Sequence, residues 1–193
     1  MPAIIGHLLI FVAALQPAAI TLQPAAATWT GRAEAPIDGD TLRVRDEQDK
    51  LHKVKIQGID APEDGQPFFK AARDHLAKVT RERELQVTEL GKDAAGRTLA
   101  TIRIKGQDLR IDILSAGMAW HQRSVVEDPV LEAEERGAKA RHLGLWIDTD
   151  PVAPWEGRAA EEQRKNQRKS AAKSTQQGGA ARGGEKNIPP GRP

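Results

Sequence analysis

The sequence predicts an α+β domain in which a small closed sheet of five strands is capped by about three helices. Three observations support this class. Segments with the alternating pattern of half-buried strands occur on both sides of one segment with helical periodicity. Two more helical segments follow only after the last strand. The chain has 193 residues, which is enough for one domain with its own core and argues against two.

Three strands are expected at the start of the folded part. Residues Thr28–Ile37 form the first, and Asp40–Arg45 alternates polar and apolar side chains as the second. The third covers Leu51–Ile59, and the polar residues 46–50 before it predict a hairpin with a long turn. A helix over Gln66–Arg83 follows, because apolar side chains recur there every three or four residues.

The second half of the pattern has two more strands and then ends in helices. Strands are expected at Leu85–Val87 and Leu99–Ile104, on either side of a glycine-bearing turn. Asp108 begins a short helix that Gly117 ends, and a last amphipathic helix covers Leu131–Arg141. Short strands with helices inserted late suggest a closed sheet in the manner of a five-stranded OB-fold barrel.

Residues 1–27 are expected to be a signal peptide. Residues 4–15 are almost wholly apolar but too few to span a bilayer of ~30 Å, and Ala25–Ala27 offer the small side chains that a signal peptidase needs. No Lys or Arg precedes the apolar run. The segment predicts export to the periplasm or the medium. An uncleaved membrane anchor and a buried N-terminal helix are the alternatives.

Charge divides the rest of the chain into a domain and a tail. Residues 157–193 hold nine Lys or Arg and three Glu, a net charge of +6, whereas the first 156 residues have a net charge of −4. The tail has almost no large apolar residue, so it is expected to be disordered. It either attracts nucleic acid by charge alone or is a solvated terminus without a function. The folded domain is therefore placed at residues 28–156.

Composition excludes several kinds of chemistry. The chain has no cysteine, which rules out a disulfide scaffold, a Cys-ligated zinc site and a thiol nucleophile. It also has no tyrosine and few other aromatic residues. A broad aromatic platform for stacking single-stranded nucleic acid is therefore hard to build.

Three polar clusters lie where strands begin or end, namely Asp38-Gly39-Asp40-Thr41, Lys55 through Glu63, and Asp93 through Arg97. If the strands that carry the first two clusters are adjacent, Asp40 and Asp60 face each other. Two carboxylates with a backbone carbonyl and waters suit Ca2+. A bulge near Gly58 would let Lys55 converge on the same point. Taken singly, these clusters are also what turns, a helix cap and ordinary surface chemistry produce.

Taken together and in this order, the clusters resemble the staphylococcal nuclease-like (thermonuclease) family. The resemblance covers Thr28 to Trp146. Its motifs are Asp38-Gly39-Asp40-Thr41, Gly58-Ile59-Asp60-Ala61-Pro62-Glu63, Gln66-Pro67-Phe68, Gly96-Arg97-Thr98-Leu99-Ala100, Gly117-Met118-Ala119 and Gly144-Leu145-Trp146. The resemblance implies an OB-fold barrel and Ca2+-dependent cleavage of phosphodiesters in DNA and RNA.

The resemblance also implies roles for single residues. Asp40 and Asp60 would hold the metal together with the main-chain carbonyl of Ala61. Glu63 would orient or deprotonate the attacking water, which is general-base help. Arg97 would hold the scissile phosphate, whose growing negative charge a divalent cation and cationic side chains stabilise.

Two departures from the family pattern bear on activity. Lys55 stands where the family usually has a second Arg, so a single ammonium replaces a two-pronged donor, and we expect weaker catalysis rather than none. Tyrosines that often contact substrate in the family are also missing, and Arg123 and Val125 occupy the equivalent stretch. Charge, together with Trp120 or His121, would then hold the substrate, unless these two residues only pack.

The sequence therefore predicts an exported, Ca2+-dependent nuclease that acts on DNA, RNA or both as a monomer. The alternative is a weakened or inactive nuclease-fold module that binds nucleic acid or protein without cutting it. The joint presence of Asp40, Asp60, Glu63 and Arg97 favours the enzyme. Lys55 favours the module.

Overall fold

A computed structural model describes residues 26–180 of the chain, with side chains through Ser170. Residues 1–25, which hold most of the expected signal peptide, lie outside this part, as do residues 181–193 of the expected tail. The elements, in chain order, are β1 (Thr28–Pro36), β2 (Thr41–Asp46), β3 (Leu51–Ile56), β4 (Ile59–Asp60), α1 (Phe69–Thr80), β5 (Glu84–Lys92), β6 (Thr98–Ile104), β7 (Gln107–Asp108), α2 (Leu109–Ser115), β8 (Trp120–His121), α3 (Pro129–Ala140), the 3-10 turn η1 (Gly144–Ile147) and α4 (Pro154–Ala180).

The centre of the fold is a closed barrel of five strands. The main sheet has the order β3-β2-β1-β5-β6-β7, and its pairings are antiparallel. A parallel pairing of β3 with β6, with Lys55 opposite Leu99, closes the sheet on itself. We call this pairing the seam. The expected α+β class with a five-stranded OB-fold barrel is thereby confirmed, with β7 as an extension of β6.

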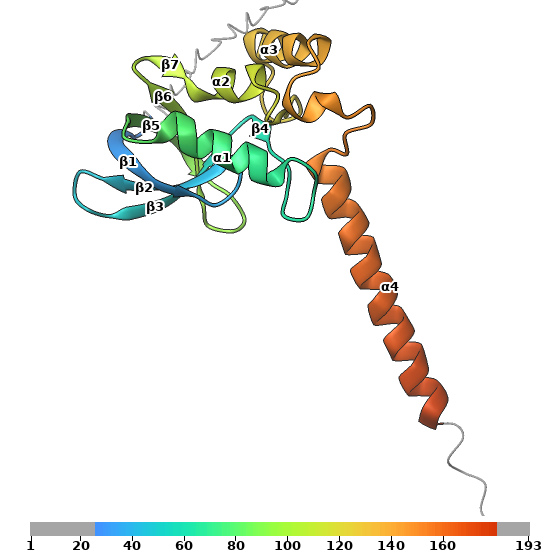
Figure 1. Ribbon diagram of the computed structural model, residues 1–193. Coiled ribbons are helices and arrows are strands. Elements are labelled where there is room, and N and C mark those ends of the chain that lie inside the picture. The colour runs from blue at the N-terminus through green and yellow to red at the C-terminus, as the bar shows by residue number, and fades with distance from the viewer. Residues whose placement is uncertain (1–25, 181–193) are drawn as a thin grey trace, which may run out of the picture.

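Apolar side chains from the strands fill the barrel. Helices α1 and α2 lie against it (Figure 1). Leu42, Val54, Ile56 and Ile102 are among the fully buried core residues. Leu76 of α1 and Ile113 of α2 belong to the same core. A second, smaller core joins α3, η1 and the approach to α4, and consists of Trp120, Ala138, Leu145, Trp146 and Ala153.

The helix starts follow local rules, with one displacement. The carboxylates of Asp108 and Asp128 accept backbone N–H groups in the first turns of α2 and α3, and Pro129 is the first residue of α3. Helix α1 begins at Phe69, three residues later than predicted, because Phe68 adopts a left-handed φ of 65° that a helix does not contain.

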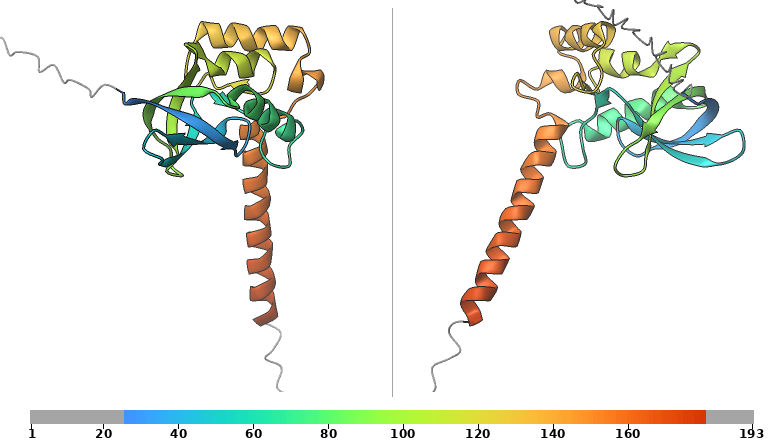
Figure 2. Two further views of the ribbon diagram at one scale, coloured as in Figure 1. Left: turned by 60° about the vertical axis from the view of Figure 1, so that its left-hand side comes forward. Right: turned by 180° about the vertical axis from the view of Figure 1, so that it is seen from behind.

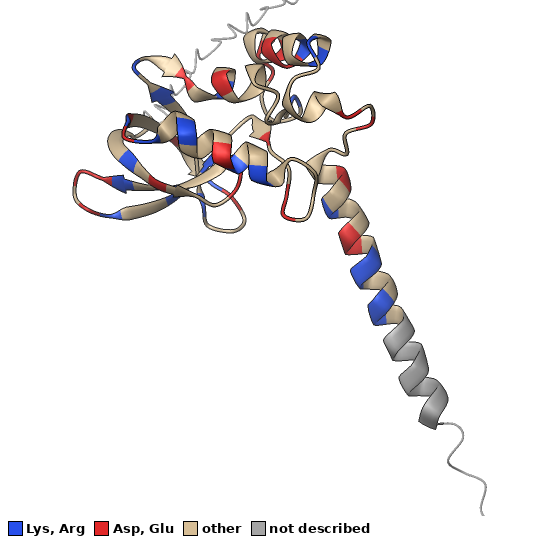
Figure 3. Ribbon diagram, viewed as in Figure 1, with Lys and Arg blue, Asp and Glu red and all other residues tan. Residues whose placement is uncertain are grey.

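The segment after Glu156 differs from the expectation of a disordered tail. Helix α4 continues to Ala180 and projects away from the barrel in every view (Figures 1 and 2). The reason is composition: the Ala, Glu, Gln, Lys and Arg residues that exclude a core are strong helix formers. Glu161 and Lys165 add an ion pair one turn apart at 2.8 Å. Residues 158–170 of the helix are exposed, and Figure 3 shows charges of both signs along them.

In the part of the chain that the structure describes, no helix combines the length and the apolar character that crossing a membrane requires.

Candidate active site

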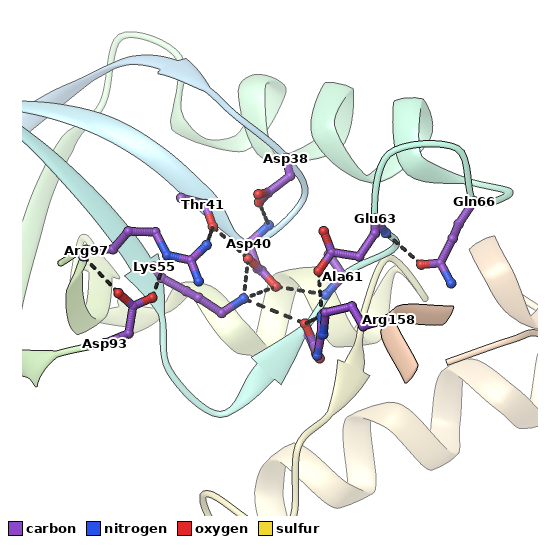
Figure 4. A network of polar contacts seen from close by, with 11 residues as sticks. Asp38, Asp40, Thr41, Lys55, Ala61, Glu63, Gln66, Asp93, Arg97 and Arg158 are labelled. Carbon is purple, nitrogen blue, oxygen red and sulfur yellow. Dashed lines mark hydrogen bonds and ion pairs between the residues drawn. The ribbon is translucent and has the colours of Figure 1, made fainter. Parts of the chain in front are cut away.

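The predicted residues converge where β2 begins and where β3 and β4 end (Figure 4). Thr41 pairs with Lys55 across β2 and β3, which puts Asp40 at the mouth of the same ladder. The backbone N–H of Ile56 donates to the carbonyl of Asp40 at 2.8 Å and holds that mouth closed. Gln57 and Gly58 then form a turn, with Gly58 at a φ of 88°, so Asp60 falls on the short strand β4. This turn, rather than a bulge, brings Asp60 back beside Lys55.

Two buried carboxylates flank one ammonium group. The Nζ of Lys55 lies 2.7 Å from both carboxylate oxygens of Asp40 and 3.6 Å from Oδ1 of Asp60. Asp40 is 2% exposed and Asp60 is 1% exposed. Asp40 also accepts hydrogen bonds from the hydroxyl of Thr41 and the backbone N–H of Ala61, both at 2.9 Å. Burial of two like charges is costly, and Lys55 offsets that cost.

A third acid, Asp38, lies beside the pair and has a raised pKa. Its Oδ1 accepts the backbone N–H of Asp40 at 3.0 Å. Burial, and then the negative charge of Asp40, raise the pKa of Asp38 to about 6, even though the backbone bond and Lys55 pull it down. Asp38 thus carries only part of a charge near pH 6.

Glu63 stands at the solvent side of the cluster. Its backbone N–H donates to Oε1 of Gln66 at 2.7 Å, which fixes the turn after Pro62. The Glu63 side chain is 43% exposed, in contrast to the two buried aspartates. A carboxylate in this position meets solvent on one side and the buried pair on the other.

Arg158, which the sequence analysis assigned to the tail, completes the cluster from α4. Its two terminal nitrogens lie 2.6 and 3.3 Å from the carboxylate oxygens of Asp60, and one of them also donates to Glu63. The hydrogen bonds to Asp60, and then its charge, raise the pKa of Arg158 above its ordinary value. Pro154 and Trp155, which start a helix and anchor it, were the sequence signal that could have pointed to this residue.

Arg97 lies on the opposite side of the cluster from Arg158, at the start of β6 (Figure 4). Its Nε donates to Asp93 at 2.5 Å, and Nη1 lies 3.5 Å from the hydroxyl of Thr41. Burial opposes ionisation of Asp93, but the side-chain and backbone hydrogen bonds of Arg97 outweigh it and lower the pKa of Asp93. The guanidinium is therefore held by one acid at the edge of the site, one hydroxyl away from Asp40.

Trp120 and His121 are buried and have packing roles. Trp120 is 7% exposed, and its ring contacts those of Trp146 and Trp155 with centroids 5.4 and 6.4 Å away. His121 is 4% exposed, and its Nε2 lies 2.8 Å from the carbonyl of Val126. The idea that these two residues grip substrate is not supported by their burial.

The donor set fits a hard divalent cation. Within residues 26–180, no group of three or more His, Cys, Asp or Glu side chains is arranged to enclose a metal. The site does offer two buried aspartate carboxylates, and a buried Ala61 donates its N–H to Asp40. Both aspartates already hold cationic side chains. Oxygen donors that attract positive charge in a small buried space are the ligands Ca2+ prefers.

The fold and the site together define a class: a closed OB-fold barrel with a nuclease-like cluster of acids and cations at the strand ends. A sequence model described as "Staphylococcal nuclease homologue" matches residues 53–148. This match contains Lys55, Asp60, Glu63 and Arg97, whereas Asp40 precedes it and Arg158 follows it.

Named relatives agree with that match. A protein named "Micrococcal nuclease" from Shigella flexneri is 35% identical over 154 residues, which cover 74% of this chain and 88% of the relative. An "Uncharacterized endonuclease" of Haemophilus influenzae is 32% identical over 125 residues, 65% of this chain and 70% of the relative. A "Probable staphylococcal-like nuclease CAN1" of Oryza sativa is 33% identical over 109 residues, and the chain spans only 33% of its length. The chain belongs to the staphylococcal nuclease homologue family.

Proposed function

We propose that the protein is a Ca2+-dependent nuclease that hydrolyses phosphodiester bonds in DNA, RNA or both. One observation carries the proposal. Two buried aspartates, a solvent-facing glutamate and cationic side chains from three separate segments meet at one point of the barrel. A module that only binds nucleic acid has no need of buried carboxylates, because these repel a polyanion.

Asp40, Asp60 and the main-chain carbonyl of Ala61 would hold the metal. Ca2+ bound there would supply positive charge against the negative charge that a phosphodiester develops during hydrolysis. Asp40 is oriented for this by Thr41 and by the backbone N–H of Ala61. Both hydrogen bonds fix the carboxylate before any substrate arrives, which is the preorganisation that catalysis needs.

Glu63 acts as the general base in this proposal. Its carboxylate is the acid of the cluster that solvent reaches, and the bond from its N–H to Gln66 fixes its backbone. A base must stand within hydrogen-bond reach of the water that it activates. Arg97, steered by Asp93, binds a phosphate oxygen from the side of Thr41, and Lys55 adds a second positive charge.

Export completes the proposal. It rests on the sequence of residues 4–27, an apolar run followed by three alanines. N-terminal sequencing of the protein recovered from outside the cytoplasm would test it. A first residue at or near Thr28 is expected, and an intact Met1 would contradict it.

The test of the activity is a digestion of plasmid DNA, single-stranded DNA and RNA with Ca2+ and with a chelator. We expect cleavage in Ca2+ only, and a loss of about a hundredfold or more in Glu63→Gln. Glu134→Gln on α3, away from the cluster, is the matched control and should cut like the unmodified protein. Binding of an oligonucleotide without cleavage would contradict the proposal and support a non-cutting module.

A further inference from the structure

Lys55, which stands where the family usually has a second Arg, is committed to the acids of the site. Its single ammonium contacts both oxygens of Asp40 and lies near Asp60, and its side chain is 17% exposed. An ammonium in that position has no planar pair of N–H groups for two phosphate oxygens. If a planar pair of N–H groups is to bind a phosphate on the Arg158 side of the cluster, a residue other than Lys55 has to supply it.

The start of α4 is built to deliver such a donor. Trp155 packs edge-on against Trp120, whose backbone pairs with Asp60 across β4 and β8. Gly157 lies so close to Gln66 that an added Cβ would come within 2.4 Å of its Nε2. Gln66 in turn holds the backbone of Glu63. The first turn of α4 therefore rests on the partners of both acids that Arg158 contacts.

Arg158 differs from Lys55 in exposure and in the shape of its contacts. It grips Asp60 with both terminal nitrogens and reaches Glu63 with one of them. Its side chain is 45% exposed, so part of the guanidinium faces solvent. Guanidinium binds a carboxylate and a phosphate by the same fork of parallel N–H groups. A rotation of the Arg158 side chain is enough to release the carboxylate and bind a phosphate.

We propose that Arg158 is a further substrate-binding residue: it pairs with Asp60 and Glu63 in the free protein and with a phosphate of the nucleic acid when the acids hold Ca2+. This rests on the proposed function. Once Asp60 serves a divalent cation, its charge is offset and its hold on Arg158 weakens. Trp155 contacts Trp120 and Gly157 packs against Gln66, so the freed guanidinium stays beside the site. Metal and phosphate then bind cooperatively, because each favours the same position of Arg158.

Calorimetry separates the two halves of this exchange. We would titrate Ca2+ alone, and then adenosine 5′-monophosphate in saturating Ca2+, into the unmodified protein, Arg158→Ala and Arg158→Lys. Arg158→Ala should bind Ca2+ alone several-fold more tightly, because a competing cation is gone. It should bind the nucleotide about tenfold more weakly, since charge-assisted hydrogen bonds are lost. Arg158→Lys should recover part of the nucleotide affinity.

Arg81→Ala, an exposed arginine at the end of α1, is the matched control and should change neither titration. Measurements at high salt screen long-range attraction and isolate the local contact. Nucleotide affinity that is unchanged in Arg158→Ala, beside tighter Ca2+ binding, would overturn the proposal and leave Arg158 as a counter-charge for the acids only. So would Ca2+ affinity that is unchanged in the same variant.

Cleavage kinetics keep this inference distinguishable from the proposed function. If the unmodified protein cuts DNA in Ca2+ and Arg158→Ala cuts with an unchanged kcat/KM, the role of Arg158 is refuted and the nuclease stands. If the unmodified protein does not cut at all, the proposed function fails first and the inference falls with it. A fall of about tenfold in kcat/KM, with the circular dichroism spectrum retained, is the expected result.

Discussion

Lys55 and Arg158 neutralise the same acids from two regions of very different character. Lys55 belongs to strand β3 of the barrel and lies between the two buried aspartates. Arg158 projects from the first turns of α4, where residues 158–170 are exposed, and it contacts the acids from the solvent side. Because the cost of losing an ion pair rises with its burial, the barrel-side cation holds the fold together, while the helix-side cation is free to exchange partners.

The largest effect is expected from replacing Asp60, the acid that both Lys55 and Arg158 contact. Asp60→Asn takes one charge from a site with two buried carboxylates, so Ca2+-dependent cleavage should fall about a thousandfold. Asp40→Asn should behave alike. Gel-based rates measure the loss, and far-ultraviolet circular dichroism checks that the barrel is intact. Asp150→Asn, on an exposed loop, should retain full activity, and so would Asp60→Asn if the proposed metal site were misplaced.

Stability measurements compare the two cations directly. Lys55→Met leaves Asp40 and Asp60 buried without their shared partner, and we expect it to lower the free energy of unfolding by about 2–4 kcal/mol in chelator. Arg158→Met should cost less, about 1 kcal/mol, because the guanidinium is 45% exposed and Lys55 remains 3.6 Å from the buried Asp60. Urea titrations at fixed pH give both values. Equal losses in the two variants would contradict the assignment of separate roles.

Most of the acidic part of the site could be predicted from the sequence. Asp40 lies just before β2, Lys55 lies in β3, and Asp60 and Glu63 lie at the end of β4 and just after it. These segments are neighbours in sequence, so the barrel brings the four residues together wherever it forms. Arg97 needed the seam, because β3 and β6 are distant in sequence and their parallel pairing leaves no local signal. Its place at the edge of the site could be expected only from a family resemblance.

Arg158 could not be assigned to the site from the sequence, for a different physical reason. Polar, apolar-poor composition predicts that a segment has no core, and this is correct for α4, but it does not predict that the segment is disordered. Helix propensity and one docked turn are enough to order it. What marks that turn is Pro154 followed by Trp155, a large apolar residue in a polar stretch. The lesson is that a single anchor beside a helix start can bring a charged side chain back to a site.

The raised pKa of Asp38 predicts how the stability of the barrel depends on pH. Asp38 has a pKa raised to about 6 from an ordinary value of 3.8, so its ionised form is disfavoured in the fold. Its cost to stability is absent below about pH 4, grows as pH rises through 6, and is complete above that. Asp38→Asn keeps the oxygen that accepts the N–H of Asp40 and removes this cost.

We therefore expect Asp38→Asn to stabilise the protein by roughly 1–3 kcal/mol at pH 8 and hardly at all at pH 4. Urea unfolding in chelator at the two pH values measures the difference. Asp46→Asn is a contrasting control, because the hydrogen bond from His52 lowers the pKa of Asp46. That variant should lose stability at pH 8. A gain in Asp38→Asn that is equal at both pH values would refute the assigned titration.

The smallest effect is expected beyond Arg158, on the exposed part of α4. Replacing Arg164, Lys165, Arg168 and Lys169 with Gln removes four positive charges that touch none of the acids of the site. KM at low salt should rise a few-fold, its salt dependence should flatten, and kcat should stay the same. Rates over a series of salt concentrations measure this. Superimposable salt profiles would mean that the distal helix does not attract the substrate.

The seam between β3 and β6 affects the order in which the site is assembled during folding. Lys55 and Arg97 lie on segments that meet only when this parallel pairing forms, and strands so far apart in sequence close late and slowly during folding. A chain whose barrel is still open thus has Asp40, Asp60 and Glu63 in one half and Arg97 in the other. Under the proposed function, cleavage would therefore require the closed barrel, because an open barrel keeps the acids apart from Arg97.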